Sequence, residues 1–314
     1  MIEFSHEPVL ARECVEYLNI VPNGTYVDGT VGGAGHASLI LASLNGFGCL
    51  IGIDRDDKAV SVSTARLSEI NSKSVVHVVR SNFVDIEKVC QDLNVTAVDG
   101  ILLDLGVSSH QFDSADRGFS YQQDAPLDMR MDRQESLTAA GIVNQYREED
   151  LVRILRTYGE ERWASRIAKF IVTARAGKYI ETTGELVEII KAAVPKAARR
   201  DGPHPARRTF QAIRIAVNDE IEKLEPAIRS CVRMLASGGR LCVISFHSLE
   251  DRIVKSVFSD MAKDCICPPE LPVCTCEHRA IVKRVTTKPI LPTSEEIERN
   301  PRARSAKLRV AEKL

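Results

Sequence analysis

The sequence contains no long apolar run and no excess of charge of one sign. Its 314 residues carry a formal net charge of −1, and 44% of them are hydrophobic. A membrane-spanning helix needs about 20 consecutive apolar residues, so the sequence predicts no such helix. The N-terminus lacks the basic and then apolar pattern of a signal peptide, and we therefore expect a cytoplasmic protein with no membrane partner. Because the net charge is near zero, any nucleic-acid surface must be a local patch.

A disulfide framework is also not indicated. The nine cysteines are scattered along a chain without an export signal, which favours reduced thiols or a metal site. Four of them form two close pairs, Cys265 with Cys267 and Cys274 with Cys276, and His278 follows. Four thiolates can bind zinc tetrahedrally, but the C-x-C spacing is tighter than usual for zinc. Structural zinc and free loop thiols both remain open, and we expect no metal in the functional site itself.

The sequence does contain a strand, a glycine-rich turn and a helix near its N-terminus. Residues 25–27 suit a strand, and the apolar run 37–44 suits the helix. The turn between them contains Gly29, Gly32, Gly33 and Gly35. This order is the first half of a nucleotide-binding βαβ unit, although a flexible surface turn is the competing interpretation. Glycines there tolerate a positive φ and let the backbone approach a ligand, while the first N–H groups of the helix offer donors to a polar or anionic group.

A carboxylate follows the second predicted strand, residues 49–53. Asp54 stands 19 residues after Gly35, where it can accept hydrogen bonds from both hydroxyls of an adenosine ribose. The alternative is that Asp54 caps the next helix, but Asp56 or Asp57 can serve as that cap. We therefore favour the ribose role for Asp54.

Two further predicted strands end in candidate site residues. Phe83 follows the strand 75–79, at the edge where ligands collect in open α/β sheets, and it either stacks on an adenine ring or fills the core. The near-continuous apolar run 98–106 is typical of a central parallel strand and contains Asp104 near its end. An ionised carboxylate is costly to bury without a partner. We therefore predict that Asp104 pairs with a cationic ligand or acts on a substrate.

The segment from Ser136 to Arg208 breaks the alternation of strands and helices. Helical patterns cover residues 148–158, 162–175 and 183–194, and Thr182 and Glu185 fit a capping box. We predict an inserted helical substrate-recognition domain over 136–208, placed over the cofactor site, within an α/β domain made of 1–135 and 209–314. A basic cluster near its end suits contacts to phosphates; it comprises Lys196, Arg199, Arg200, Arg207 and Arg208.

The remainder of the chain completes the predicted sheet. An amphipathic helix is expected from Thr209, a second helix from Pro226 to Gly238-Gly239, and the fifth parallel strand over 240–246. The polar run 247–252 either lines a substrate pocket or caps the following helix. Residues 281–287 and 306–311 predict an antiparallel edge. The fold class is therefore α/β, a Rossmann-like, mostly parallel, doubly wound sheet with an inserted helical domain.

Eight motifs, spread in order over nearly the whole chain, carry a specific resemblance. They are Val27–Thr30, Asp104–Ser109, Arg117–Ser120, Leu127–Asp132, Tyr158–Arg162, Arg208–Ala212, Ile244–Arg252 and Asn300–Ser305. Together they resemble the small-subunit ribosomal RNA methyltransferase H family, also called MraW, which has the class I methyltransferase fold and uses S-adenosylmethionine.

The resemblance implies N4-methylation of the cytidine at position 1402 of 16S rRNA, with the small ribosomal subunit as partner. It also implies a set of cofactor contacts: Ala34, Gly35, His36, Asp54, Phe83, Asp104 and Gln111. Ala34 stands where the family loop is often glycine, and its methyl group is tolerated if φ is negative. A homodimer stays open, because the sequence does not reveal the oligomeric state.

Asp104 is the predicted catalytic residue. A hydrogen-bond acceptor beside the weakly nucleophilic cytosine amine would favour a pyramidal nitrogen and take up developing positive charge, with Ser108 and Ser109 as orienting neighbours. The Ser/Asp-Pro-Pro-Tyr/Phe motif of many amino-methylating enzymes is absent. Two other functions remain as alternatives. An NAD-dependent oxidoreductase shares the glycine loop and the acid after the second strand, and a non-catalytic RNA-binding assembly factor would keep the basic clusters alone.

Overall fold

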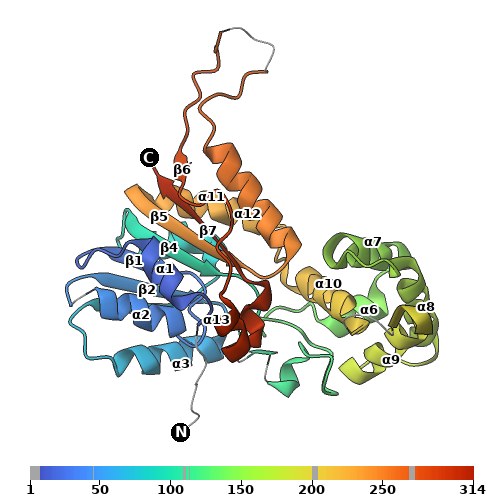
Figure 1. Cartoon of the computed structure of the whole chain (residues 1–314). Helices are drawn as coiled ribbons and strands as arrows, with labels where there is room; N and C mark the ends of the chain where they lie inside the picture. Colours follow the sequence, from blue (N-terminus) through green and yellow to red (C-terminus); the bar gives the residue numbers. More distant parts are fainter. Residues whose placement is uncertain (1–7, 45, 109–110, 113, 200–203, 269–272) are drawn as a thin grey trace. The chain divides into compact units, whose positions relative to one another are not determined.

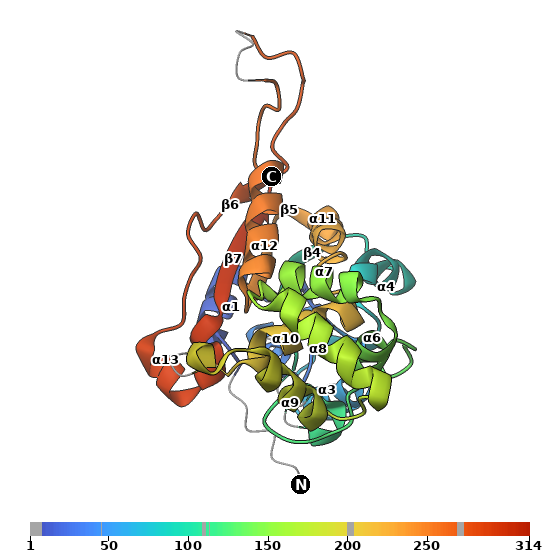
Figure 2. The same cartoon turned by 90° about the vertical axis from the view of Figure 1, so that its right-hand side faces the viewer.

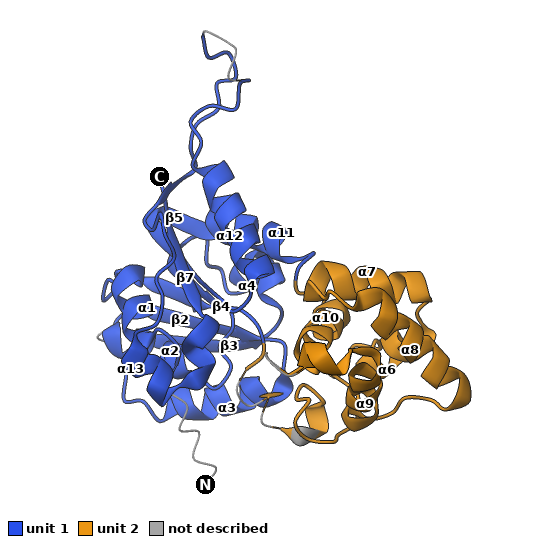
Figure 3. Cartoon of the chain, turned by 45° about the vertical axis from the view of Figure 1, so that its right-hand side comes forward, with its two compact units in different colours: residues 1–106, 221–314 blue, residues 107–220 orange. Residues whose placement is uncertain are grey.

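The computed structural model describes residues 8–44, 46–108, 111–112, 114–199, 204–268 and 273–314. The chain divides into two compact units, coloured separately in Figure 3. Unit 1 comprises residues 1–106 and 221–314, and unit 2 comprises residues 107–220. None of the helices in the described part of the chain has the length and apolar character needed to span a bilayer.

Unit 1 is built on one sheet, in which the described residues form seven strands in the order β3-β2-β1-β4-β5-β7-β6. The strands are β1 (Thr25–Asp28), β2 (Cys49–Asp54), β3 (Val75–Arg80), β4 (Val98–Asp104), β5 (Leu235–Ser245), β6 (Val282–Arg284) and β7 (Lys307–Lys313). Strands β1 to β5 pair in parallel, whereas β7 is antiparallel to both β5 and β6. The predicted doubly wound sheet with an antiparallel edge is confirmed.

Helices cover both faces of the sheet in unit 1, because alternate strand residues point to opposite sides. Leu102 belongs to one apolar cluster, and its neighbours Ile101 and Leu103 belong to the other. The Leu102 side is covered by α1 (Ala11–Leu18), α2 (Gly35–Ser43), α3 (Asp57–Ser68) and η4 (Pro301–Ser305). The opposite side is covered by α4 (Ile86–Asp92), α11 (Leu224–Met234) and α12 (Ser248–Met261). The short helices η1 (Phe83–Asp85) and α13 (Ser294–Arg299) complete the described elements of unit 1.

The strand order places a topological switch point between β1 and β4. The chain runs outward from β1 through β2 to β3, and then crosses back to form β4 on the other side of β1. The connections therefore leave the carboxyl ends of β1 and β4 in opposite directions, and open α/β sheets bind their ligands in the crevice at such a point. Asp28 ends β1 and Asp104 ends β4, so this crevice begins with two carboxyl groups.

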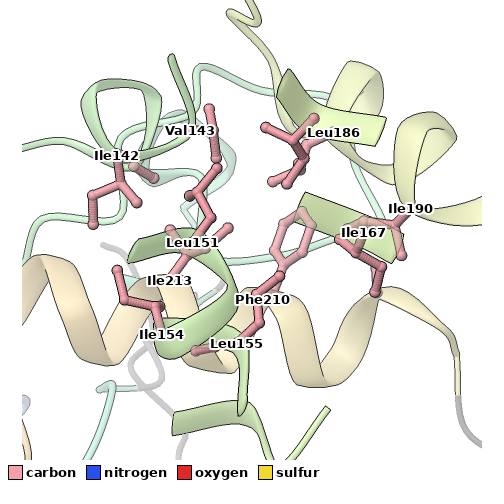
Figure 4. Packing of buried hydrophobic residues seen from close by; sticks show 14 of the residues in the cluster. Ile142, Val143, Leu151, Ile154, Leu155, Ile167, Leu186, Ile190, Phe210 and Ile213 are labelled. Atoms are coloured by element: carbon pink, nitrogen blue, oxygen red, sulfur yellow. The ribbon is translucent and has the colours of Figure 1, made fainter. Parts of the chain in front are cut away.

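Unit 2 is a helical body with its own apolar core. Its described elements are η2 (Ala115–Arg117), α6 (Ala139–Gln145), α7 (Glu148–Gly159), α8 (Ala164–Gly177), α9 (Thr183–Ala193), η3 (Lys196–Arg199) and α10 (Ala206–Asn218). Figure 4 shows Leu151, Ile167 and Phe210 in the centre of this core. Amphipathic helices of this length gain most of their stability from such packing.

The observed boundaries of unit 2 differ from the expected 136–208. Leu127, Met129 and Met131, which precede the predicted start, are buried in the core of unit 2. Asn218 fixes the same stretch, because its side-chain amide donates to Met129 O at 2.8 Å and its Oδ1 accepts from Met131 N–H at 2.8 Å. Side-chain packing, and not helical periodicity, thus decides where this unit begins and ends.

The predicted capping box at the start of α9 is present. The Thr182 hydroxyl accepts from Glu185 N–H, and the Glu185 carboxylate accepts from Thr182 N–H. We expect Thr182→Ala to lower the free energy of unfolding by about 1 kcal/mol, the usual cost of losing an N-cap. Chemical denaturation measures this. Thr173→Ala is the matched control, because the exposed Thr173 hydroxyl only bonds the carbonyl of Lys169 within α8; equal losses in both variants would contradict the cap.

Two expected elements are shifted. The helix expected to run to Gly238-Gly239 ends at Met234, and both glycines lie within β5. Leu235 pairs with Val98 of β4, so strand pairing ends the helix earlier than the glycines predict. The amphipathic stretch after Thr209 is interrupted after Asn218, where Asp219 takes φ +51° as the C-cap of α10.

Candidate active site

The glycine-rich turn follows β1 and leads into α2, as predicted. Gly32 has φ +49°, the conformation that glycine tolerates, and its N–H donates to Asp54 Oδ2 at 3.0 Å. Gly35 has a different reason to be glycine, since an added Cβ would lie 3.1 Å from the ring of Pro8. The turn is therefore an ordered loop tied to β2 and not a flexible surface turn.

Ala34 does not meet the condition under which its methyl group was expected to be tolerated, a negative φ. It is fully buried and has φ +61°, and it stands at the N-cap position of α2 without a side-chain cap. A left-handed conformation costs an L-residue about 1–2 kcal/mol. The methyl group is therefore accommodated with backbone strain at the start of the helix.

Asp54 ends β2 and is tied to the backbone through both oxygens. Oδ2 accepts from Gly32 N–H, and Oδ1 accepts from Asp56 N–H at 2.9 Å. Asp56, in turn, is the N-cap of α3, since its carboxylate accepts from Lys58 N–H. The cap interpretation of Asp54 is thereby excluded. Burial raises the pKa of Asp54, although these hydrogen bonds oppose the shift.

Asp104 ends β4 with its carboxyl group only partly satisfied. Its side chain is 27% exposed, and Oδ2 lies 3.8 Å from His36 Nδ1. Oδ1 is buried and has no hydrogen-bond partner within the described residues. Burial raises the pKa of Asp104 to about 8, and the carboxyl groups of Asp28 and Glu250 add to the shift. A buried acceptor oxygen without a donor is suited to a cationic or N–H-bearing ligand.

His36 faces Asp104 from the first turn of α2. Its Nε2 lies 2.8 Å from Val9 O, and because a carbonyl only accepts, Nε2 carries the proton. Burial lowers the pKa of His36 to about 4, so the ring is neutral at pH 7. The lone pair of Nδ1 therefore points toward Asp104, and His36 adds a hydrogen-bond acceptor to the site.

Asp28 is a site residue that sequence reasoning overlooked. It is 1% exposed, and its carboxylate accepts from Thr30 N–H at 3.1 Å and from Ala37 N–H at the start of α2. One donor that α2 was expected to offer to a ligand is thus bonded to the protein itself. Burial raises the pKa of Asp28 to about 7, with Asp54 adding to the shift. The feature of the sequence that could have identified Asp28 is a lone carboxylate at the end of an apolar strand.

Three carboxyl groups, those of Asp28, Asp54 and Asp104, thus meet at the carboxyl ends of β1, β2 and β4. All three have raised pKa values because they are desolvated, and Asp28 interacts electrostatically with both of the others. A cation placed among them would favour their ionised forms and be held in return. A ligand that carries positive charge would therefore complement these three carboxyl groups.

Phe83 lies beside the glycine turn, as expected for a residue that follows β3. It begins η1 and is partly buried against the apolar cluster of α4 and α11. Its Cβ lies 3.2 Å from the position of a Cβ added to Gly29. The ring thus packs on the core, and its predicted stacking on an adenine stays a prediction.

Three of the predicted residues belong to unit 2. Gln111 is 4% exposed, and its Oε1 accepts from Ser108 N–H while its own N–H donates to Ser108 Oγ, both at 3.2 Å. Ser109 lies outside the described residues. The cofactor role of Gln111 and the orienting roles of Ser108 and Ser109 stay predictions.

The polar run after β5 caps the next helix. His247 is the N-cap of α12, with a capping box in which Glu250 N–H faces His247 Nδ1 and Glu250 Oε2 accepts from His247 N–H. Glu250 is 2% exposed and also accepts from Phe246 N–H at 2.8 Å. Of the two roles left open for this run, the structure supports the cap.

Comparison with known proteins identifies the family. The sequence profile described as the MraW methylase family matches residues 3–314. The chain belongs to the MraW methylase family. It is 59% identical to the ribosomal RNA small subunit methyltransferase H of Acetivibrio thermocellus and 57% identical to that of Ruminiclostridium cellulolyticum. Both comparisons extend over 313 residues and cover 100% of each chain. The protein of the same name from Clostridioides difficile is 56% identical over 313 residues, again with 100% of each chain covered.

The conformation of Ala34 in this MraW methylase leads to a testable contrast. We expect Ala34→Gly to change the free energy of unfolding by less than about 1 kcal/mol, because relief of the left-handed strain offsets the lost methyl burial of about 0.8 kcal/mol. Ala34→Val should cost about 2 kcal/mol or more, since a branched side chain is poorly accommodated at positive φ in a filled site. Urea denaturation measures both. Equal stability of the valine variant and the parent would contradict the described loop conformation.

Proposed function

We propose that this protein transfers a methyl group from S-adenosylmethionine to N4 of the cytidine at position 1402 of 16S rRNA in the small ribosomal subunit. The observation that carries the proposal is the full-length identity of 56–59% to proteins named ribosomal RNA small subunit methyltransferase H. The site supports it, because the crevice at the switch point offers groups that match each part of the cofactor.

The residues present fit S-adenosylmethionine. In this proposal, Asp54 accepts hydrogen bonds from the ribose hydroxyls while it holds the glycine turn through Gly32. Phe83 contacts the adenine. The unpartnered Oδ1 of Asp104 and the neutral His36 face the positively charged portion of the cofactor in this proposal. S-adenosylmethionine supplies an electrophilic methyl group on a sulfonium, and the desolvated carboxyl groups of the crevice favour such a cation over a neutral or anionic ligand.

Asp104 also serves as the acceptor for the cytosine amine in this proposal. The lone pair of that amine is delocalised into the ring, so positioning and charge stabilisation must supply much of the acceleration. A carboxylate that accepts from the amino group holds the nitrogen in line with the methyl group and stabilises its developing positive charge. Because Asp104 has a pKa of about 8 without ligand, it can also retain a proton taken from the methylated nitrogen.

The target cytidine must leave any duplex, because its amine has to reach the crevice. We propose that the basic cluster of residues 196–208 in unit 2 contributes phosphate contacts. Arg208 is partly engaged within that unit, since its Nη1 donates to Glu160 O at 3.0 Å, and Arg200 lies outside the described residues. The proposal places the protein with the small ribosomal subunit in the cytoplasm, and light scattering will distinguish a monomer from a homodimer.

The deciding experiment measures transfer of labelled methyl groups to small ribosomal subunits isolated from a strain that lacks the gene. We expect one methyl group per subunit, and mass spectrometry of the decoding-region fragment should place it on N4 of the predicted cytidine. Methylation of another nucleotide would refute the assigned target. No transfer, together with retained subunit binding, would favour the assembly factor, and binding of NADH without S-adenosylmethionine would favour the oxidoreductase.

A further inference from the structure

Residues 262–268 and 273–281, which belong to the connection between α12 and β6, extend away from the sheet of unit 1 in both Figure 1 and Figure 2. We call this segment the arm. None of its described residues is buried, and Ile266 and Val273 are 61% and 70% exposed. A short segment without an apolar core cannot hold its conformation by burial, and small structures of this kind depend on cross-links or metals. The arm contains four of the nine cysteines of the chain.

The four cysteine sulfurs of the arm gather around one point. The Sγ atoms of Cys265, Cys267, Cys274 and Cys276 all lie within 4.8 Å of one another. Cys274 Sγ lies 3.4 Å from that of Cys265, 4.0 Å from that of Cys267 and 3.6 Å from that of Cys276. Tetrahedral zinc with Zn–S bonds of about 2.3 Å holds its sulfurs about 3.8 Å apart. A disulfide would require about 2.05 Å.

The backbone of the arm supports the same arrangement. Ile266 N–H donates to Cys276 Sγ at 3.5 Å, and Thr275 N–H donates to Cys267 Sγ at 3.4 Å. Each C-x-C turn thus directs its central amide at a sulfur of the other turn. Amide donors of this kind favour thiolate over thiol and orient the sulfurs toward a shared ion. The tight C-x-C spacing is therefore compatible with a four-sulfur site, because the two turns face each other.

We propose that Cys265, Cys267, Cys274 and Cys276 bind one Zn²⁺ ion that fixes the conformation of the arm. Four thiolates complete a closed tetrahedral site of the structural type, which leaves His278 outside the ligand set. On binding, the thiols release their protons to solvent as the Zn–S bonds form, with no change of oxidation state. The site is separate from the strand-end carboxyl groups of the proposed methyl-transfer site.

The first test is metal analysis of the full chain, purified with reduced thiols and without chelators. We expect about one zinc per chain. Cys265→Ser and Cys276→Ser should each weaken zinc binding at least about 100-fold in competition with a chromophoric chelator, more than the 10–100-fold cost of losing a supporting residue. Cys49→Ser, which removes a half-buried thiol outside the arm, and His278→Ala are the matched controls, and both should retain the metal.

A second measurement needs no variant. Replacement of the bound ion by Co²⁺ in the parent protein should produce the absorption of a tetrahedral cobalt–thiolate site, and chelation should accelerate proteolysis within the arm while the sheet remains folded. The proposal would be overturned by no metal uptake by the reduced chain, by stoichiometric iron in place of zinc, or by unchanged zinc affinity in both serine variants. Loss of zinc from His278→Ala would indicate that the His278 imidazole is a ligand in place of one thiolate, and it would thereby refute the four-cysteine set.

Discussion

Asp104→Asn is expected to weaken S-adenosylmethionine binding about 100-fold and to reduce methyl transfer at least as much. Asparagine keeps the shape of the side chain but removes the charge that faces the cationic cofactor. Loss of one partner of a desolvated charge pair costs about 2–5 kcal/mol, and loss of a group that stabilises developing charge costs about 100–1,000-fold in turnover. Calorimetric titration and single-turnover assays measure the two effects separately. Near-normal binding and turnover in this variant would refute both roles of Asp104.

The same variant should stabilise the protein in the absence of cofactor. Asp104 has a pKa of about 8 in the folded chain, above its ordinary value of 3.8, because it is desolvated. Its contribution to stability is therefore fully present below about pH 4 and is lost as the pH rises through about 8. At pH 8 we expect Asp104→Asn to raise the free energy of unfolding on the order of 2 kcal/mol. Denaturation of the ligand-free chain at pH 6 and pH 8 tests the sign.

Cofactor affinity should also depend on pH through Asp104. Below about pH 8 a proton competes with the cation for this carboxylate, so affinity should fall by up to tenfold per pH unit. Asp104→Asn should abolish the part of this dependence that lies near pH 8, whereas Asp28, with a pKa of about 7, continues to titrate at lower pH. Asp99→Asn is the matched control, because Asp99 lies on the same strand near its other end, where it accepts from Thr25 N–H. An identical pH profile in parent and Asp104→Asn would show that another group controls binding.

Asp54→Ala is expected to weaken cofactor binding about 100-fold, because the substitution acts twice. It removes the proposed acceptor for the ribose hydroxyls, and it leaves Gly32 N–H, which holds the glycine turn, without its carboxylate. Each hydrogen bond to a charged group contributes about 1.5–3 kcal/mol. Comparison of S-adenosylmethionine with its 2′-deoxy and 3′-deoxy analogues separates the two effects, since the parent should discriminate against the analogues and the variant should not.

Asp56→Ala is the control for Asp54→Ala. Asp56 is two residues away and also carries a buried carboxylate, but its described contact is the cap of α3. We expect a loss of about 1 kcal/mol in stability with cofactor affinity changed less than about threefold. If both variants lose affinity equally, the effect of Asp54 is one of local folding and its ribose contact is wrong.

The strands could be predicted because buried parallel strands have near-continuous apolar sequences. Residues 49–53 and 98–104 illustrate this, since their alternate side chains enter two different cores. Predictions of helix ends from local sequence were wrong where tertiary contacts outweigh local preference. Gly238-Gly239 has the composition of a helix end, yet α11 already ends at Met234. Leu235 then pairs with Val98, and both glycines lie in the irregular part of β5 before its regular pairing with β4 begins at Arg240.

The sequence allowed prediction of those candidate site residues whose type has one main chemical explanation at its position in the fold. Asp54 and Asp104, as carboxylates at strand ends, were inferred from the residues, whereas His36 entered through the family resemblance. Asp28 was overlooked because its role depends on its proximity to Asp104 in the folded chain. From the neighbouring strand, its carboxyl group raises the pKa of Asp104. The left-handed backbone of Ala34 was likewise not predictable, because alanine has no local preference for it.

The insertion of unit 2 between β4 and β5 has a consequence for synthesis of the protein. Asp104 pairs with Ile244, a partner about 140 residues later in the chain. At translation rates of about 5–20 residues per second, β5 is therefore synthesised roughly 7–28 s after β4, and one edge of β4 stays unpaired during that time. During that interval an apolar strand has an unpaired edge, which is the condition that favours aggregation and chaperone binding. Early folding of the 107–220 body on the ribosome would shorten the effective loop that joins the two strands.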